Sequence, residues 1–215
     1  MRFTSLGQRA VAVASVAIVA AGLNTGAASA HGKTGTKSLA AVLTADKSGF
    51  DRNGRDFDIL TAAVLAVLKA KPASPVAVLT DGTTALTAFV PTDTAFEKLV
   101  ADLRGTRRLP GEQQAFTAVA GLGIDTVESV LLYHVVPGAT IDRRTALKSD
   151  GAKLATAAGA QVTVDVTGRW WFRQVKLVDA DRTDRDPRVV TFDINRGNRQ
   201  IAHAVDAVLR PSDLP

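Results

Sequence analysis

Histidine is the residue type in this sequence best suited to metal or proton chemistry, and it occurs at His31, His134 and His203. If His31 became the first residue of a mature chain, its amine and ring could together bind copper, although such a site needs a second convergent ligand. His134 and His203 lie in apolar segments, where an imidazole is typically a hydrogen-bonded part of the core. We therefore expect structural roles for these two, and a metal-dependent oxidoreductase built on His31 is one hypothesis.

Carboxylate side chains gather in residues 179–187, which read Asp-Ala-Asp-Arg-Thr-Asp-Arg-Asp-Pro. This oxygen density is typical of calcium loops, but such a loop needs Gly at its sixth position and Glu at its twelfth. Asp184 and Val190 stand at those positions, and the nearby arginines would neutralise the acids. The pattern favours a solvated charged turn over a calcium site.

Other catalytic patterns are missing from the sequence. It has no cysteine, which excludes disulfides, thiolate zinc sites and cysteine nucleophiles. It also has no Gly-x-Ser-x-Gly elbow, no phosphate-binding glycine loop and no His-Glu-x-x-His motif. We therefore expect no catalytic residue, no metal ligand and no cofactor.

The aromatic cluster Trp170-Trp171-Phe172 is a candidate for contact with a sugar or a protein. On a strand, consecutive side chains face opposite ways, so one tryptophan is expected in the core and the other partly exposed.

Basic side chains recur in small groups. The groups are Arg104/Arg107/Arg108, Arg143/Arg144 and Arg196/Arg199. The formal net charge is +5 for the whole chain and +3 without residues 1–30, a mild value, so anionic envelope polymers are more plausible partners than nucleic acid.

The first 30 residues have the pattern of a signal peptide. Arg2 and Arg9 give a positive start, Ala10–Leu23 is apolar and uncharged, and residues 28–30 read Ala-Ser-Ala, a cleavage pattern. The apolar stretch is shorter than the roughly 20 residues of a membrane span, and no later segment approaches that length. We predict export through this signal peptide, a secreted product and no membrane span in the mature chain.

The remaining chain, roughly 185 residues, is long enough for one domain with its own core. Residues 31–37 are polar, and we expect a flexible segment there. Residues 38–215 are expected to form a single domain, and its oligomeric state stays open.

Apolar spacing predicts helices mainly in the first half of the chain. The predicted helices are a turn at Leu39–Leu43, a long helix over 58–71, one opened by a capping box at Thr94 and ending near Leu103, and a short one from Asp125 to before Pro137. Residues 46–56 and 105–111 indicate loops.

Strand patterns dominate the second half. Residues 162–166, 190–194 and 201–207 alternate with period two and predict half-buried strands. Earlier in the chain, residues 76–79 and 85–90 flank Asp81-Gly82 and predict a hairpin. Helices followed by strands indicate an α+β fold, with helices packed against a largely antiparallel sheet or sandwich.

Three segments carry a family resemblance. They are Thr87–Phe96, Leu131–Gly138 and Ile201–Pro211. In this order they resemble the three signature regions of the fasciclin-type domain, and the resemblance extends over about residues 38–211. The matching positions of structural type are Pro91, Thr92, Phe96, Pro137, Gly138, His203 and Asp206.

The resemblance implies a fasciclin-like α+β fold, with helices against a mostly antiparallel β-sandwich or wedge. It also implies an adhesive role for Tyr133-His134, although a satisfied core pair explains these residues as well. The candidate binding residues are Asp93, Tyr133, His134, Trp170 and Trp171.

Three of these polar side chains have expected contacts. His134 is expected to donate to the turn at residues 91–93 or to a nearby carbonyl. Asp93 is expected to cap the helix that follows it, and Asp206 to point away from His203. Both carboxylates are therefore expected to be structural.

The resemblance favours an extracellular binding or adhesion module without turnover. Its expected partners are an extracellular protein, the matrix or an anionic envelope polysaccharide. Two alternatives stay open: a secreted metal-dependent oxidoreductase using His31, and a small-ligand carrier with a pocket between helices and sheet.

Overall fold

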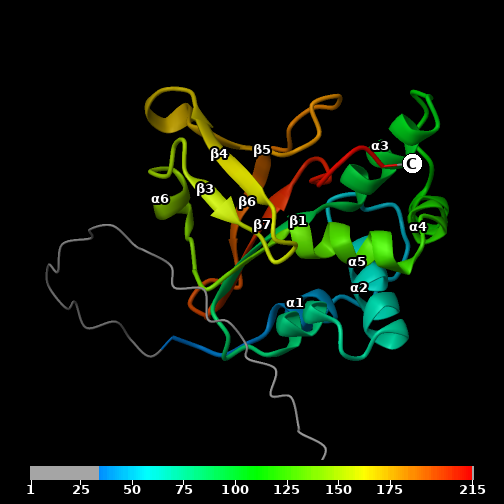
Figure 1. The fold of residues 1–215 in the computed structure, drawn as a ribbon, viewed down its shortest axis with the longest axis horizontal. Helices are drawn as coiled ribbons and strands as arrows, with labels where there is room; N and C mark the ends of the chain where they lie inside the picture. Colours follow the sequence, from blue (N-terminus) through cyan, green and yellow to red (C-terminus); the bar gives the residue numbers. More distant parts are fainter. Residues whose placement is uncertain (1–33, 215) are drawn as a thin grey trace, which may run out of the picture. The chain divides into compact units, whose positions relative to one another are not determined.

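The computed structural model describes residues 34–214, drawn in colour in Figure 1. The predicted signal peptide, residues 1–30, and His31 lie outside the described residues. In Figure 1, helices α2 to α5 lie on one side of the fold and strands β3 and β4 on the other, with β1 and β7 between them.

The helices include the four that the sequence predicts. These are α1 (Leu39–Leu43), α2 (Asp58–Ala70), α3 (Asp93–Leu103) and α5 (Ile124–Tyr133). The unpredicted helical segments are the 3₁₀ helix η1 (Pro75–Thr80), α4 (Glu112–Gly121), α6 (Arg143–Ala146) and the 3₁₀ helix η2 (Trp170–Phe172). The apolar spacing of α4 is too weak to predict a helix. Of the apolar side chains in this helix, only Ala115 and Val119 are buried.

The strands form two sheets. In the first, β1 (Leu86–Pro91), β2 (Val135–Pro137), β6 (Val189–Ile194) and β7 (Gln200–Val205) take the order β2-β1-β7-β6. In the second, β3 (Lys153–Ala155), β4 (Gln161–Thr167) and β5 (Gln174–Val178) follow chain order. β1 and β7 run parallel, and the other pairs are antiparallel. The fold is therefore α+β, as predicted.

The four-stranded sheet is covered on both faces. Ala88 and Ala204 belong to the core formed with the helices, whereas Phe89 and Val205 belong to the core formed with the three-stranded sheet. All six residues of β7 are buried as a result. The prediction of a half-buried strand is therefore wrong for β7, because alternation alone does not reveal a second covering layer.

The predicted hairpin is wrong in its first strand. Ser74 Oγ accepts the N–H of Val76 at 3.2 Å, and Pro75 presets a helical φ, so η1 forms here instead. Val76 and Leu79 are then buried three residues apart. The second predicted strand is present as β1, and it pairs with β2 and β7.

Part of the segment expected to be flexible is held by hydrogen bonds. Gly35 N–H donates to the carbonyl oxygen of Gly197 at 2.7 Å, and Arg199 N–H donates to the carbonyl of Gly35 at 3.0 Å. Lys37 N–H donates to Asn198 Oδ1 at 2.9 Å. Backbone groups of residues 35–37 are thus satisfied by the turn after β6, and the flexibility of residues 31–37 stays a prediction.

α3 begins earlier than the predicted capping box. Thr92, and not Thr94, is its N-cap, and Thr92 Oγ1 accepts the N–H of Ala95 at 3.3 Å. Thr92→Ala should lower the free energy of unfolding by about 1 kcal/mol, because it removes the side-chain cap and leaves that N–H only the Thr92 carbonyl, at 2.9 Å. Thr94→Ala is the matched control and should cost less than about 0.5 kcal/mol. Urea denaturation of both variants checks this, and a larger loss for Thr94→Ala would contradict the cap assignment.

No single helix among residues 34–214 has the length and apolar character to cross a membrane. α4 and α5 together have the required length and apolar character, but the chain bends by 107° between them.

Candidate binding surface

Tyr133 and His134 end α5, and both are buried, at 0% and 4% exposed. The Tyr133 hydroxyl donates to the carbonyl of Gln161 at 3.1 Å. His134 Nδ1 donates to the carbonyl of Val130 at 2.7 Å, and its Nε2 accepts the N–H of Leu209 at 2.9 Å. These partners require a neutral ring with its proton on Nδ1. Burial lowers the pKa of His134 to about 4, so the ring stays neutral near pH 7.

The pair is therefore a structural tie between α5, β4 and the segment after β7. The expected bond of His134 to a nearby carbonyl is confirmed, but the expected bond to the turn at 91–93 is not formed. Neither side chain reaches the surface of the described structure, so a partner cannot contact the pair directly.

Asp93 is the first residue of α3 and is fully buried. Its two carboxylate oxygens accept the N–H groups of Asp58 at 3.0 Å and Ile59 at 2.8 Å. Asp93 thus caps α2, and the expectation that it caps α3 is wrong because Thr92 already does so. Burial raises the pKa of Asp93 to about 8, and the neighbouring Asp56 adds to the rise.

His203 and Asp206 form no catalytic dyad. Asp206 follows β7, accepts the N–H of Arg188 at 2.8 Å and pairs with the side chain of Arg185. Both ring nitrogens of His203 are bonded to backbone groups elsewhere. Both residues therefore have structural partners.

The other positions of the family pattern are architectural. Phe96 is buried against the helices, Pro91 ends β1, Pro137 ends β2, and Gly138 has a left-handed φ of 81°.

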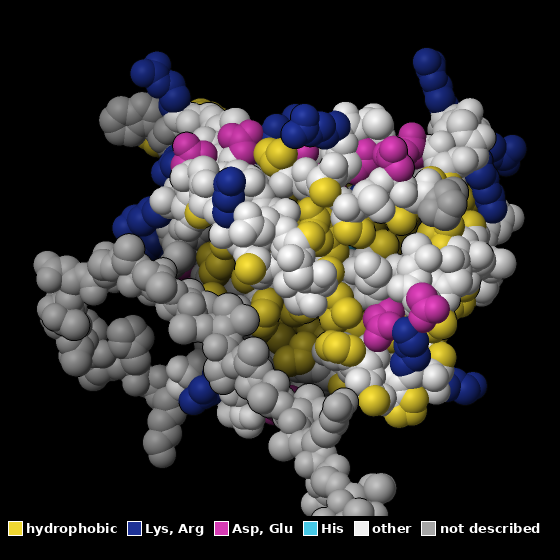
Figure 2. All heavy atoms as spheres, viewed as in Figure 1, with side chains coloured by type: hydrophobic (Ala, Val, Ile, Leu, Met, Phe, Trp, Pro, Cys, Tyr) yellow, Lys and Arg dark blue, Asp and Glu magenta, His cyan; other side chains and the backbone are white. Residues whose placement is uncertain are grey.

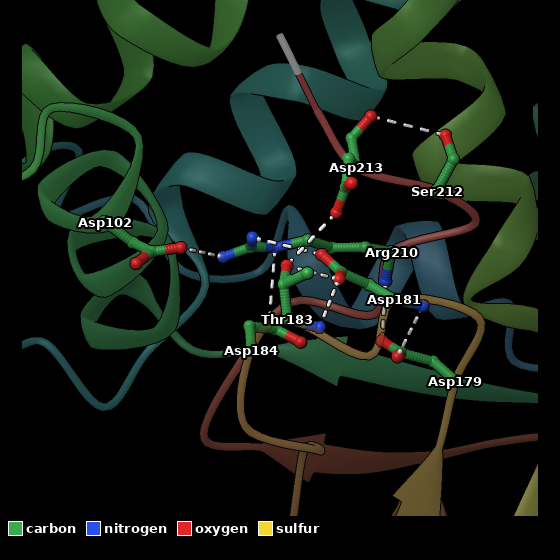
Figure 3. Close-up of polar contacts among 8 residues, drawn as sticks. All are labelled: Asp102, Asp179, Asp181, Thr183, Asp184, Arg210, Ser212 and Asp213. Atoms are coloured by element: carbon green, nitrogen blue, oxygen red, sulfur yellow. Dashed lines mark hydrogen bonds and ion pairs between the residues drawn. The ribbon is translucent and has the colours of Figure 1, made fainter.

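The acidic segment 179–187 is folded against Arg210, as Figure 3 shows. The Arg210 guanidinium lies 3.3 Å from Asp181 and 3.2 Å from Asp184, and on its other side 2.8 Å from Asp102. Asp179 accepts the backbone N–H of Arg210 at 2.8 Å. The expectation of a solvated turn is wrong for Asp181 and Asp184, which neutralise the buried Arg210, whereas Arg182, Thr183 and Arg185 are exposed.

The aromatic cluster lies on η2, a short 3₁₀ turn, and not on a strand as expected. Trp171 and Phe172 are 79% and 77% exposed, and their ring centroids are 6.2 Å apart. The side chain of Trp170 lies outside the described part of the structure.

A basic hollow on the surface brings five cationic side chains together. It encloses about 670 Å³, and its lining residues are Asp142, Arg143, Arg144, Leu147, Lys148, Arg173, Asp193 and Arg196. These residues lie in or next to α6, directly after η2, and at or just after the end of β6. The structure thus joins two of the basic groups flagged in the sequence, Arg143/Arg144 and Arg196, which lie far apart in the chain.

The buried ring of His203 links the two chain segments that line opposite sides of the basic hollow. Its Nε2 donates to the carbonyl of Ile141 at 2.8 Å, and its Nδ1 accepts the N–H of Asp193 at 3.2 Å. Asp193 has a left-handed φ of 63°, and its carboxylate accepts the N–H of Arg143 at 2.7 Å. Burial lowers the pKa of His203, which favours the neutral ring that can accept this bond.

The charge of the hollow is not balanced by ion pairs. Among residues 34–214, none of its five Arg and Lys side chains forms a salt bridge, although Arg143 lies 5.6 Å from the ring of Phe192. The carboxylates of Asp142 and Asp193 accept backbone N–H groups. On the face shown in Figure 2, Lys and Arg side chains stand mostly at the edge of the view, and hydrophobic side chains gather nearer its centre. Hydrogen bonds from Thr145 lower the pKa of Asp142, and the charges of Arg144 and Arg196 add to this effect. The hollow therefore holds five cations and two carboxylates, an excess of positive charge.

The other flagged arginines contribute less. Arg104 and Arg108 line a second hollow of about 550 Å³, without another cation. Arg107 and Arg199 line neither. Lys148 and Arg173 also line the basic hollow, and the sequence patterns did not indicate either of them. The one available signal was that Arg173 directly follows the aromatic cluster.

Comparison with known families identifies the fold. A family model described as the Fasciclin domain matches residues 60–211. The chain belongs to the fasciclin domain family. The range 60–211 includes all three signature segments, so the resemblance seen in the sequence is confirmed.

Comparison with solved structures finds a FAS1 domain pair from the insect cell adhesion molecule Fasciclin I. The identity is 14%, the match covers 74% of this chain and 46% of that chain, and the TM-score is 0.47. This fasciclin chain therefore spans less than half the length of that one. No curated protein matches the chain.

Fasciclin domains are adhesion-related modules, which fits a binding role. The three signature segments of this domain build its interior: β1 with the start of α3, the end of α5 with β2, and β7 with its extension. The basic hollow lies outside these segments, apart from the support given by His203.

Proposed function

We propose that this fasciclin domain is an exported binding module that holds an anionic envelope polysaccharide in the basic hollow, without chemical turnover. The convergence of five cations without ion pairs is the observation that carries the proposal. Four of them are arginines, whose planar guanidinium groups bind carboxylate, sulfate and phosphate through two hydrogen bonds at once. Trp171 and Phe172, on the turn just before Arg173, offer apolar faces against which sugar rings can pack.

The geometry favours this proposal over the carrier and the enzyme. Two apolar cavities in the described interior measure about 20 Å³ each, room for about one water molecule, so they suit no small ligand. His134 and His203 use all four ring nitrogens in backbone hydrogen bonds, which leaves neither free as a second metal ligand. An oxidoreductase built on His31 therefore has no support from the described residues.

The double variant Arg143→Ala/Arg196→Ala tests the basic hollow. Its affinity for dextran sulfate, measured by biolayer interferometry, should fall at least about tenfold, because two charge-assisted contacts are removed. Binding by the parent should weaken as salt is raised, and uncharged dextran should not bind.

Arg104→Ala/Arg108→Ala is the matched control, because it removes the same charge from the second hollow. It should retain affinity within about threefold. Equal losses in the two double variants would show that net charge, and not the basic hollow, determines binding.

A further inference from the structure

The first residues of three helices converge, and all three are acidic. Asp58 begins α2, Asp93 begins α3 and Glu112 begins α4. Each carboxylate is buried. The positive ends of the three helices favour negative charge here, each with roughly half an elementary charge.

The loop before α2 brings two more carboxylates to this point. Oxygens of Asp51, Asp56 and Asp58 lie within 4.8 Å of one another, and so do oxygens of Asp56, Asp93 and Glu112. Asp56 belongs to both groups, so the five residues form one acidic cluster. The loop is anchored to α3 because Asp93 N–H donates to the carbonyl of Asp56 at 3.1 Å.

Asp58 is directed into the cluster without a partner. The residue is only 9% exposed, and its Oδ2 is buried and makes no hydrogen bond. Asp56 Oδ1 is buried and unpaired as well, while Asp56 Oδ2 accepts from Asn53 at 2.9 Å. An unpaired buried carboxylate oxygen costs free energy, so a group that satisfies it is required.

The described protein supplies too little positive charge for that purpose. Among residues 34–214, no Lys or Arg forms an ion pair with any of the five carboxylates. Three helix ends together offset about one and a half charges, which does not balance the carboxylates gathered here. A bound cation or shared protons must make up the difference.

We propose that the acidic cluster is a calcium site, with Asp56 and Asp58 as central ligands and Asp51 at its exposed edge. Ca²⁺ takes six to eight oxygens at about 2.3–2.6 Å, so oxygens that share one ion lie up to about 5 Å apart, as they do here. Mg²⁺ demands a tighter octahedron and releases water reluctantly, so it fits the cluster less well. Asp51, Asp56 and Asp58 precede the range matched by the family model, whereas Asp93 and Glu112 lie within it.

Thermal unfolding of the full chain, freed of metal with EDTA, tests the site. CaCl₂ at about 100-fold excess over its Kd should raise Tm by about 5–10 °C, at constant ionic strength, and MgCl₂ should raise it much less. Calorimetric titration should give about one Ca²⁺ per chain. A parent protein that shows no response to Ca²⁺ would overturn the proposal, and an equal response to Mg²⁺ would overturn the assignment of calcium.

Asp58→Asn keeps the shape of the side chain and should weaken Ca²⁺ binding at least about tenfold. Asp51→Asn, at an exposed position, should weaken it as well. Asp125→Asn is the matched control, since Asp125 is an exposed acid paired with Lys71 outside the cluster, and it should keep the full response. A full Ca²⁺ response in Asp58→Asn would place the ion elsewhere and overturn the proposal.

Discussion

Arg210→Met should destabilise this fasciclin domain by about 3–5 kcal/mol, the largest effect we expect from a single substitution. The guanidinium is 8% exposed and lies between Asp181, whose side chain is 0% exposed, and Asp184, at 12%. Methionine fills similar volume but removes the charge, so it leaves two buried carboxylates uncompensated. Burial raises the pKa of Asp184, and the positive charge of Arg210 opposes that rise. Urea denaturation measures the loss.

Asp102→Asn separates the buried from the exposed part of this network. Asp102 contacts the same guanidinium at 2.8 Å, but its side chain is 58% exposed. The substitution should cost less than about 1 kcal/mol, because water screens an exposed pair. If Arg210→Met cost no more than Asp102→Asn, burial would not be what gives the network its strength.

His134→Ala should destabilise the domain by about 3 kcal/mol. The substitution opens a cavity in the core and leaves the N–H of Leu209 and the carbonyl of Val130 without partners. Chemical denaturation near pH 7 measures the loss. An unchanged free energy of unfolding, combined with lost binding, would instead make His134 a recognition residue.

The pH dependence of the same variant gives an independent check. In the unfolded chain His134 binds a proton near pH 6.5, but burial lowers its pKa in the folded chain to about 4. The parent therefore loses stability as the pH falls from about 6.5 to about 4, by roughly 3 kcal/mol from this group alone. The difference between parent and His134→Ala should shrink across that window. A constant difference would contradict a buried neutral ring.

The sequence predicted the elements whose patterns are local. The apolar stripe of residues 58–71 and the alternation of residues 162–166 and 190–194 are present as α2, β4 and β6. β2 has only three residues and exists because it pairs with β1, so no local pattern could indicate it. η1 was mistaken for a strand because apolar residues at 76–79 suit both structures, and the deciding signal was Pro75 after Ser74.

The candidate sites depend on contacts between residues that are far apart in the chain, which sequence patterns do not reveal. Arg143 and Arg196 were flagged as separate groups, and they share a hollow because His203 ties Ile141 to Asp193. The acidic cluster depends on three helix starts meeting, and the sequence shows only that each of them is acidic. Tyr133 and His134 match the family motif, but both are buried. Their motif therefore indicated the fold and not a contact surface.

Chemical-shift mapping by NMR tests the central claim most directly, because it shows where a polyanion binds without altering the protein. ¹⁵N-labelled protein titrated with short dextran sulfate chains at low salt should show its largest amide shifts in residues 142–148, 171–173 and 193–196, and these shifts should disappear as salt is added. Shifts centred on residues 104–114, or spread evenly over all basic residues, would contradict binding in the basic hollow.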